Sequence, residues 1–225
     1  MLKEALARNQ KLNSFYERAK KIEPCDAAHD FSHIERVAKI AIEIYAREIS
    51  MREKRQIAEF EIDNIALAAI LHDCVPVPKD SPLRKESSRI SSEKAREWLV
   101  EAKWSERSID EICYAIRDHS FSAGYTPSSL LGECLQDADR LESLGAIGLY
   151  RTIATGVSMG CTLFDSTDPW AKNRELDDRK FSVDHFFTKL LKLPASFRTA
   201  AAREEAEKRA DFLRSFVSQL HHEID

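Results

Sequence analysis

Apolar residues recur at helical spacing along most of the chain, and this pattern limits the fold more than any other feature. In the segment before Asp73 the apolar side chains stand at offsets of 3, 4, 7 and 8, which places them on one face of a helix: Ile62, Ile65, Ala66, Ala69 and Ile70. Only 6 Gly and 7 Pro occur among 225 residues, and no alternating apolar stretch lies between hairpin turns. We therefore expect an all-α fold.

The same periodicity predicts where the helices lie. We expect them at about 2–21, 31–49, 60–74, 88–102, 106–119, 128–142, 146–158, 182–193 and 196–221. With 43% hydrophobic residues, a chain of this length can bury one substantial core. We predict a single domain over 1–225, a helical bundle with its core at about 29–193, on which the helices at 2–21 and 196–221 pack.

Composition excludes several classes of partner. The formal net charge is −4 although 32% of the residues are charged, which argues against binding polymeric nucleic acid. The five cysteines are odd in number and form no C-x-x-C, which is typical of reduced thiols and a cytoplasmic location. The first 20 residues are rich in charge, unlike a signal peptide, and the apolar run "IALAAIL" is too short to span a membrane.

Four polar residues stand on three predicted helices, three of them on the apolar faces and the fourth, His72, directly before Asp73. Asp73 takes the next position on its stripe, His33 begins the row that continues to Ile44, and Asp139 continues the row from Leu131. A carboxylate that points into an apolar layer needs a cationic side chain or a metal ion to compensate it. Any one of the four fits a cap or an ion pair, but His33, His72, Asp73 and Asp139 together favour one divalent metal.

The ligand types narrow the choice of metal. Imidazole suits borderline transition metals and carboxylate suits harder ones. The mixed set therefore favours Mn or Mg, with Co, Ni and Fe as alternatives, over a structural zinc. Four protein ligands also leave two positions of an octahedral ion open for water and substrate.

Longer strings around these residues resemble a known family. The order H…HD…D with "SHIERV" is similar to HD-domain metal-dependent phosphohydrolases, and the strings resemble the bacterial YedJ/YpgQ branch: "HDFSHIERV", "AAILHDCV", "RDHSFSAG", "LQDADRLESLGAIGLYRT", "TLFDSTDPW" and "DHFFTKLLKLP". The resemblance covers about residues 29–220. It implies an all-α HD domain with His33, His72, Asp73 and Asp139 as metal ligands. It also implies hydrolysis of phosphate compounds, which in one member type is a nucleoside triphosphate pyrophosphatase.

The chemistry of phosphate hydrolysis suggests roles for further residues. A metal ion can polarise a phosphoryl oxygen and activate a water as the nucleophile. Asp73, as a ligand, and His119 are the candidate catalytic residues, His119 as proton donor or as hydrogen-bond donor to a phosphate. The alternative for His119 is a histidine at a helix end, bonded to a backbone carbonyl. Arg36, Lys79 and Arg84 are candidate phosphate contacts, although such residues are also common in surface salt bridges.

Two functions of different class remain open. The first is a phosphohydrolase that acts on nucleotides or similar small phosphate compounds. The second is a regulatory HD module that binds a nucleotide without turnover, and a homodimer fits either one. A second metal near His185, held by Asp177, Asp178 and Asp184, is an alternative, but we prefer a structured lid or pocket edge for this region. No phosphate-binding glycine motif supports a kinase or a dinucleotide-binding fold.

Overall fold

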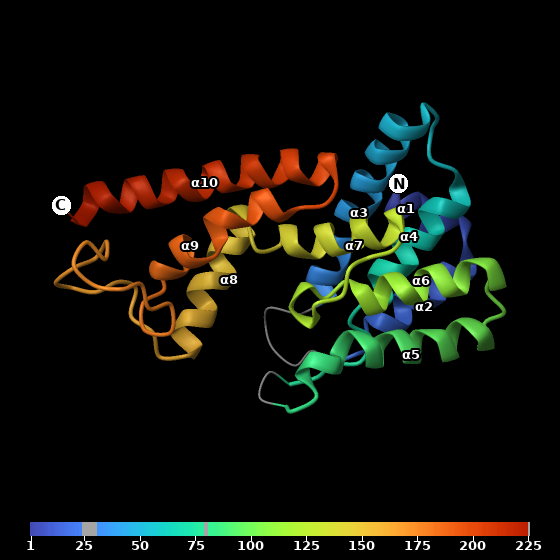
Figure 1. The fold of residues 1–225 in the computed structure, drawn as a ribbon. Helices are drawn as coiled ribbons and strands as arrows, with labels where there is room; N and C mark the ends of the chain where they lie inside the picture. Colours follow the sequence, from blue (N-terminus) through green and yellow to red (C-terminus); the bar gives the residue numbers. More distant parts are fainter. Residues whose placement is uncertain (24–30, 79–80, 225) are drawn as a thin grey trace. The chain divides into compact units, whose positions relative to one another are not determined.

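The chain is all-α, as predicted. The computed structural model describes residues 1–23, 31–78 and 81–224 (Figure 1), and the backbone alone at residue 122. Within these residues there is no β-strand, and one isolated bridge joins Thr162 to Phe181. None of the helices in the described part of the chain is long and apolar enough to cross a membrane. The chain divides into two compact units, Met1–Asp139 and Arg140–Asp225, and a single domain over 1–225 stays a prediction.

Each unit has its own set of helices. Unit 1 contains α1 (Leu2–Arg8), α2 (Gln10–Ala19), α3 (Phe31–Glu53), α4 (Glu59–Leu71), α5 (Ser87–Glu101), α6 (Glu106–Asp118) and most of α7 (Leu130–Leu141), with short 3-10 turns at Arg84–Glu86 and Phe121–Ala123. Unit 2 contains α8 (Gly145–Ser158), α9 (Asp184–Thr188), the 3-10 segment η3 (Leu190–Ser196) and α10 (Ala200–Ile224).

Helix α4 is the centre of unit 1. All residues from Ile65 to Leu71 are fully buried, because α4 packs against α2, α3 and α6. Its first turn is fixed by Glu61, whose carboxylate accepts hydrogen bonds from Arg55 at 2.6 and 2.7 Å and from the Ala58 backbone N–H at 2.8 Å. Because α4 is fixed at its first turn and packed along its length, the residues at its C-terminal end lie at a defined position.

The predicted N-terminal helix at 2–21 is wrong in one respect, because it is two helices. Asn9 separates α1 from α2 with an extended backbone (φ −107°, ψ 99°). Its side-chain oxygen accepts a hydrogen bond from the Leu12 N–H, which makes Asn9 the N-cap of α2, while its Nδ2 donates to Asp63 on α4 at 2.9 Å. The break allows both short helices to contact α4.

The predicted helices at 182–193 and 196–221 are also wrong at their boundaries. Helix α9 ends at Thr188, and η3 with Pro194 inside it takes the next residues. The final helix begins only at Ala200, because Phe197 is extended and Thr199 caps the first turn by accepting the Ala202 N–H. In unit 2, α10 packs on α8 and η3, and Phe186 stacks on Phe216 at 5.7 Å between ring centroids.

The segment 160–180 of unit 2 is tied to α9 by a partly buried ion pair. Arg174 donates to both carboxylate oxygens of Asp184, at 2.6 and 2.9 Å, and the Asp177 N–H donates to the same carboxylate at 2.7 Å. With its oxygens occupied in this way, Asp184 has a structural role. The alternative of a second metal that uses Asp184 therefore has no support, and a structured edge fits the contacts.

Removal of the Asn9 cap gives a test of this arrangement. We expect Asn9→Ala to lower the free energy of unfolding by about 1–2 kcal/mol, because α2 loses its cap and Asp63 loses a hydrogen-bond donor. Urea denaturation followed by circular dichroism measures this change. The matched control is Asn13→Ala, on the exposed side of α2, which should leave stability unchanged or raise it slightly. Equal stability of the two variants would contradict the role of Asn9.

Candidate metal centre

The ends of helices bring the predicted ligands together in unit 1. His72 and Asp73 directly follow the last residue of α4, and His33 lies in the first turn of α3. Asp139 stands in the last turn of α7, and His119 directly follows α6. Because α3 and α6 both pack against the buried α4, segments distant in sequence meet at its C-terminal end.

The distances describe one compact cluster. His33, His72 and Asp73 each offer a ligand atom within 4.8 Å of the other two. His33 Nε2 lies 3.4 Å from Asp139 Oδ1, and His72 Nε2 lies 3.7 Å from Asp73 Oδ2. The two imidazoles are buried, whereas the carboxylates are about 30% exposed. The cluster therefore has a buried nitrogen side and an open oxygen side.

His72 is oriented as metal-binding histidines usually are. Its Nδ1 lies 2.7 Å from the Ala69 carbonyl oxygen, so Nδ1 carries the proton and donates it to that oxygen. The lone pair of a neutral imidazole is then on Nε2. That atom is buried and makes no hydrogen bond to any described residue, which is unfavourable unless something else binds it. A divalent cation fits this position by charge and by donor chemistry.

His119 joins the cluster in the same orientation. Its Nδ1 lies 2.6 Å from the Ile116 carbonyl oxygen, and its Nε2 lies 3.8 Å from Asp73 Oδ1. Its ring packs edge-on against His72 at 4.9 Å between centroids. Burial, and next the neighbouring His72, lower the pKa of His119. The backbone bond expected for a helix-end histidine is present, and it leaves Nε2 directed at the cluster.

Charge around the cluster favours a bound cation. Burial raises the pKa of Asp139, but the neighbouring His33, His72 and His119 outweigh it, so the pKa is lowered and the carboxylate is ionised. Helices α4 and α6 both end here, and a helix C-terminus carries partial negative charge. Carboxylates and helix ends together provide the negative potential that a divalent ion needs.

The three predicted phosphate contacts have different outcomes. Arg36 lies on α3 one turn after His33, and its Nη1 donates to Ser32 Oγ at 2.8 Å. Arg84 is exposed, and its Nη1 donates to the Val77 carbonyl at 2.9 Å. Lys79 lies outside the described residues. Contact with a substrate stays a prediction for all three.

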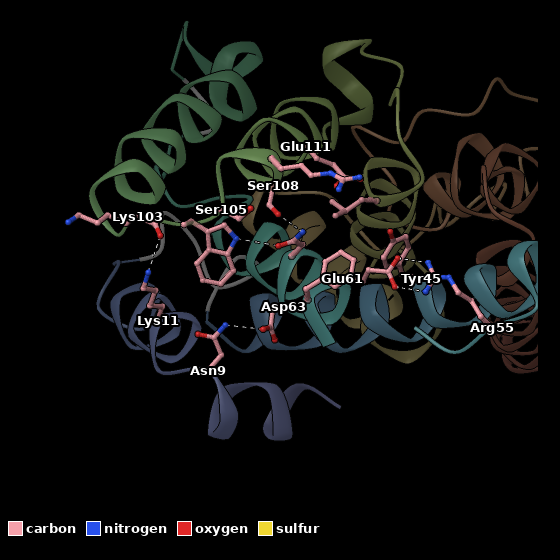
Figure 2. A pocket seen from close by; sticks show the side chains of 15 residues that line it. Asn9, Lys11, Tyr45, Arg55, Glu61, Asp63, Lys103, Ser105, Ser108 and Glu111 are labelled. Carbon is pink, nitrogen blue, oxygen red and sulfur yellow. Dashed lines mark hydrogen bonds and ion pairs between the residues drawn. The ribbon is translucent and has the colours of Figure 1, made fainter. Parts of the chain in front are cut away.

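Unit 1 also contains a cavity of about 740 Å³ that the sequence did not reveal (Figure 2). It lies at the opposite ends of α4 and α6 from the cluster, lined by Glu61 and Ser108 among others. Asn64 bridges two of its walls, because its Oδ1 accepts from Trp104 Nε1 at 3.3 Å and its Nδ2 donates to Ser108 Oγ at 3.0 Å. A buried asparagine on an apolar helix is the signal that sequence analysis could have used.

Comparison with known proteins places this geometry in a family. The family model described as HD domain matches residues 30–144, which include His33, His72, Asp73, His119 and Asp139. The uncharacterized protein YpgQ of Bacillus subtilis (strain 168) is 29% identical over 202 residues, covering 88% of this chain and 85% of that protein.

Solved structures give the same relationship. The crystal structure of B. subtilis YpgQ in complex with ADP matches with a TM-score of 0.68 and 26% identity, covering 96% of this chain and 95% of that one. An HD-superfamily hydrolase from Bacillus thuringiensis matches with a TM-score of 0.67 and 29% identity over 99% and 98% of the two chains. With a family match over more than half of its residues and a histidine–aspartate cluster inside the matched stretch, the chain belongs to the HD domain family.

Proposed function

We propose that the chain is a metal-dependent phosphohydrolase that acts on nucleotides or similar small phosphate compounds, with a nucleoside triphosphate pyrophosphatase as the first activity to test. The observation that carries the proposal is the buried Nε2 of His72, whose lone pair faces ionisable carboxylates and makes no hydrogen bond to the described residues. The hydrolase descriptions of related structures support the reaction class.

Four residues would hold the ion: His33, His72, Asp73 and Asp139. A divalent ion, Mn or Mg by the donor set, would polarise a phosphoryl oxygen and make a water more acidic. The two buried imidazoles would hold the ion at a defined position, because the His72 ring is fixed by its backbone bond and by α4. The partly exposed carboxylates lie on the side from which a substrate can approach.

The tautomer of His119 suits a proton acceptor better than a proton donor. Its Nδ1 proton is committed to the Ile116 carbonyl, so Nε2 of the neutral ring carries a lone pair. Donation from Nε2 would require the imidazolium, which burial disfavours. We therefore assign His119 to accept the proton of the attacking water, in place of the donor role that the sequence suggested.

Nucleotides are the favoured substrates, because the related YpgQ was crystallised with ADP. Arg36, Lys79 and Arg84 remain proposed contacts for the phosphate groups, and Arg84 has an exposed side chain that can reach solvent. The same ADP complex also favours a second candidate, a nucleotide-binding regulatory module without turnover. The hydrolase would release phosphate or pyrophosphate, whereas the regulatory module would release neither.

Loss of a ligand should remove the metal. In His72→Ala and Asp73→Ala we expect the affinity for Mn²⁺ to fall by about 100-fold or more, because a coordinating atom is lost. Isothermal titration with Mn²⁺ and elemental analysis after dialysis measure the change. His222→Ala, an exposed histidine near the C-terminus, serves as the control and should bind as the unaltered chain does. Full metal content in Asp73→Ala would refute the ligand set.

Removal of His119 should separate metal binding from turnover. We expect His119→Ala to keep its metal while kcat falls by about 10²–10⁴-fold, the usual contribution of a general acid or base. Metal stoichiometry and steady-state kinetics are measured on the same preparation. Unchanged kinetics would leave His119 with only its structural bond to Ile116, and loss of the metal would make it a ligand.

Product analysis decides between the two candidate functions and identifies the bond that is cut. The chain, loaded in turn with Mn, Mg, Co and Ni, is incubated with nucleoside mono-, di- and triphosphates, and phosphate and pyrophosphate are assayed separately. We expect turnover of at least one nucleotide and its loss in Asp73→Ala. Tight nucleotide binding without any release of phosphate or pyrophosphate would favour the regulatory module.

A further inference from the structure

Unit 2 contains a second cavity, separate from the residues of the metal cluster. It measures about 410 Å³, within the range of sites for small ligands, and lies between α8 and the segment from Asp178 to Leu190. Basic and hydroxyl side chains dominate its wall, and those that matter below are Arg151, Thr152, Thr155, Arg179, Ser182 and Lys189.

Arg151 on α8 is the unusual residue of this cavity. Its Nη1 is buried, and among the residues that the structure describes this atom has no hydrogen-bond partner and the guanidinium has no ion pair. A guanidinium is always charged and carries five N–H donors. Burying part of a guanidinium without a hydrogen-bond acceptor costs a free energy comparable to the loss of a hydrogen bond to a charged group. An acceptor from outside the protein would remove this penalty.

The other charges of the cavity do not neutralise Arg151. Arg179 and Lys189 are exposed, and neither side chain is ion-paired within the described part of the chain. The one carboxylate of the wall, Asp178, already accepts hydrogen bonds from His185 Nδ1 and Thr188 Oγ1, both at 2.9 Å. These bonds lower the pKa of Asp178, and the charge of Arg179 adds to this effect. Three cations therefore face one engaged carboxylate.

The backbone of α8 leaves room for hydroxyl groups beside these cations. A Cβ placed on Gly156 would lie 2.1 Å from Ser182 Oγ, so only glycine lets this hydroxyl approach the helix. Thr152 and Thr155 line the same wall. Thr155 lies one helical turn after Arg151, and Thr152 lies one turn before Gly156. Hydroxyls can donate to an anion that the cations attract.

We propose that this cavity binds a phosphate group, free or carried by a nucleotide, with Arg151 as its main ligand and Lys189 as a second cation. A phosphate has enough oxygens to accept from a guanidinium, an ammonium and neighbouring hydroxyls at once, and Arg binds it in a bidentate manner. The proposal stands without the proposed hydrolase function, because it uses none of the metal-cluster residues.

Binding to the metal-free full chain tests the site. In EDTA at low salt, isothermal titration with inorganic phosphate, pyrophosphate, ADP and adenosine is compared for the unaltered chain and for Arg151→Gln and Lys189→Gln. We expect one phosphate-containing ligand to bind per chain, at least about tenfold more weakly in Arg151→Gln and several-fold more weakly in Lys189→Gln. Lys192 of η3 is exposed and lies outside the cavity, so Lys192→Gln should bind as the unaltered chain does.

The ligands distinguish the source of the phosphate. Tighter binding of ADP than of pyrophosphate, with the same loss in Arg151→Gln, identifies a nucleotide site, and equal binding identifies a site for the free anion. Adenosine that binds as well as ADP, or pyrophosphate that binds Arg151→Gln and Lys189→Gln as well as the unaltered chain, would refute the proposal. Circular dichroism shows whether the variants fold. If Arg151→Gln does not fold, Lys189→Gln, at an exposed position, provides the test.

Discussion

The bond between His72 Nδ1 and the Ala69 carbonyl is the contact on which the candidate centre depends. It fixes which ring nitrogen carries the proton, and it holds the ring at the end of a helix whose last residues are fully buried. A lone pair is thereby confined to a place where water does not reach it. The donor set around it, two imidazoles and two carboxylates, can serve a divalent ion and leaves its oxygen side open.

Helix ends supply the rest of the centre. His72, Asp73 and His119 occupy positions just past the last turns of α4 and α6, where backbone carbonyls remain free to accept the imidazole Nδ1 protons. The C-terminal end of a helix therefore orients each of these two histidines and also places partial negative charge where a cation would bind. The same bond leaves the lone pair of the neutral His119 ring on Nε2, and this is the basis for proposing His119 as a proton acceptor.

The two units differ in what they offer to a phosphate compound. Unit 1 provides a negative, partly buried cluster that suits a metal ion, and its carboxylates would repel a phosphate without that ion. Unit 2 provides a basic cavity in which Arg151 has no acceptor from the described residues.

The sequence by itself determined the helical class and indicated the residues of the candidate centre, because helical periodicity places His33, Asp73 and Asp139 on apolar faces where an uncompensated polar group is unfavourable. It did not determine the break at Asn9 or the late start of α10, since both depend on single capping bonds. It also could not assign the tautomers of His72 and His119, because these follow from carbonyls that are free only at helix ends. The cavity around Arg151 appeared only in the tertiary structure, where burial and the missing acceptor become visible.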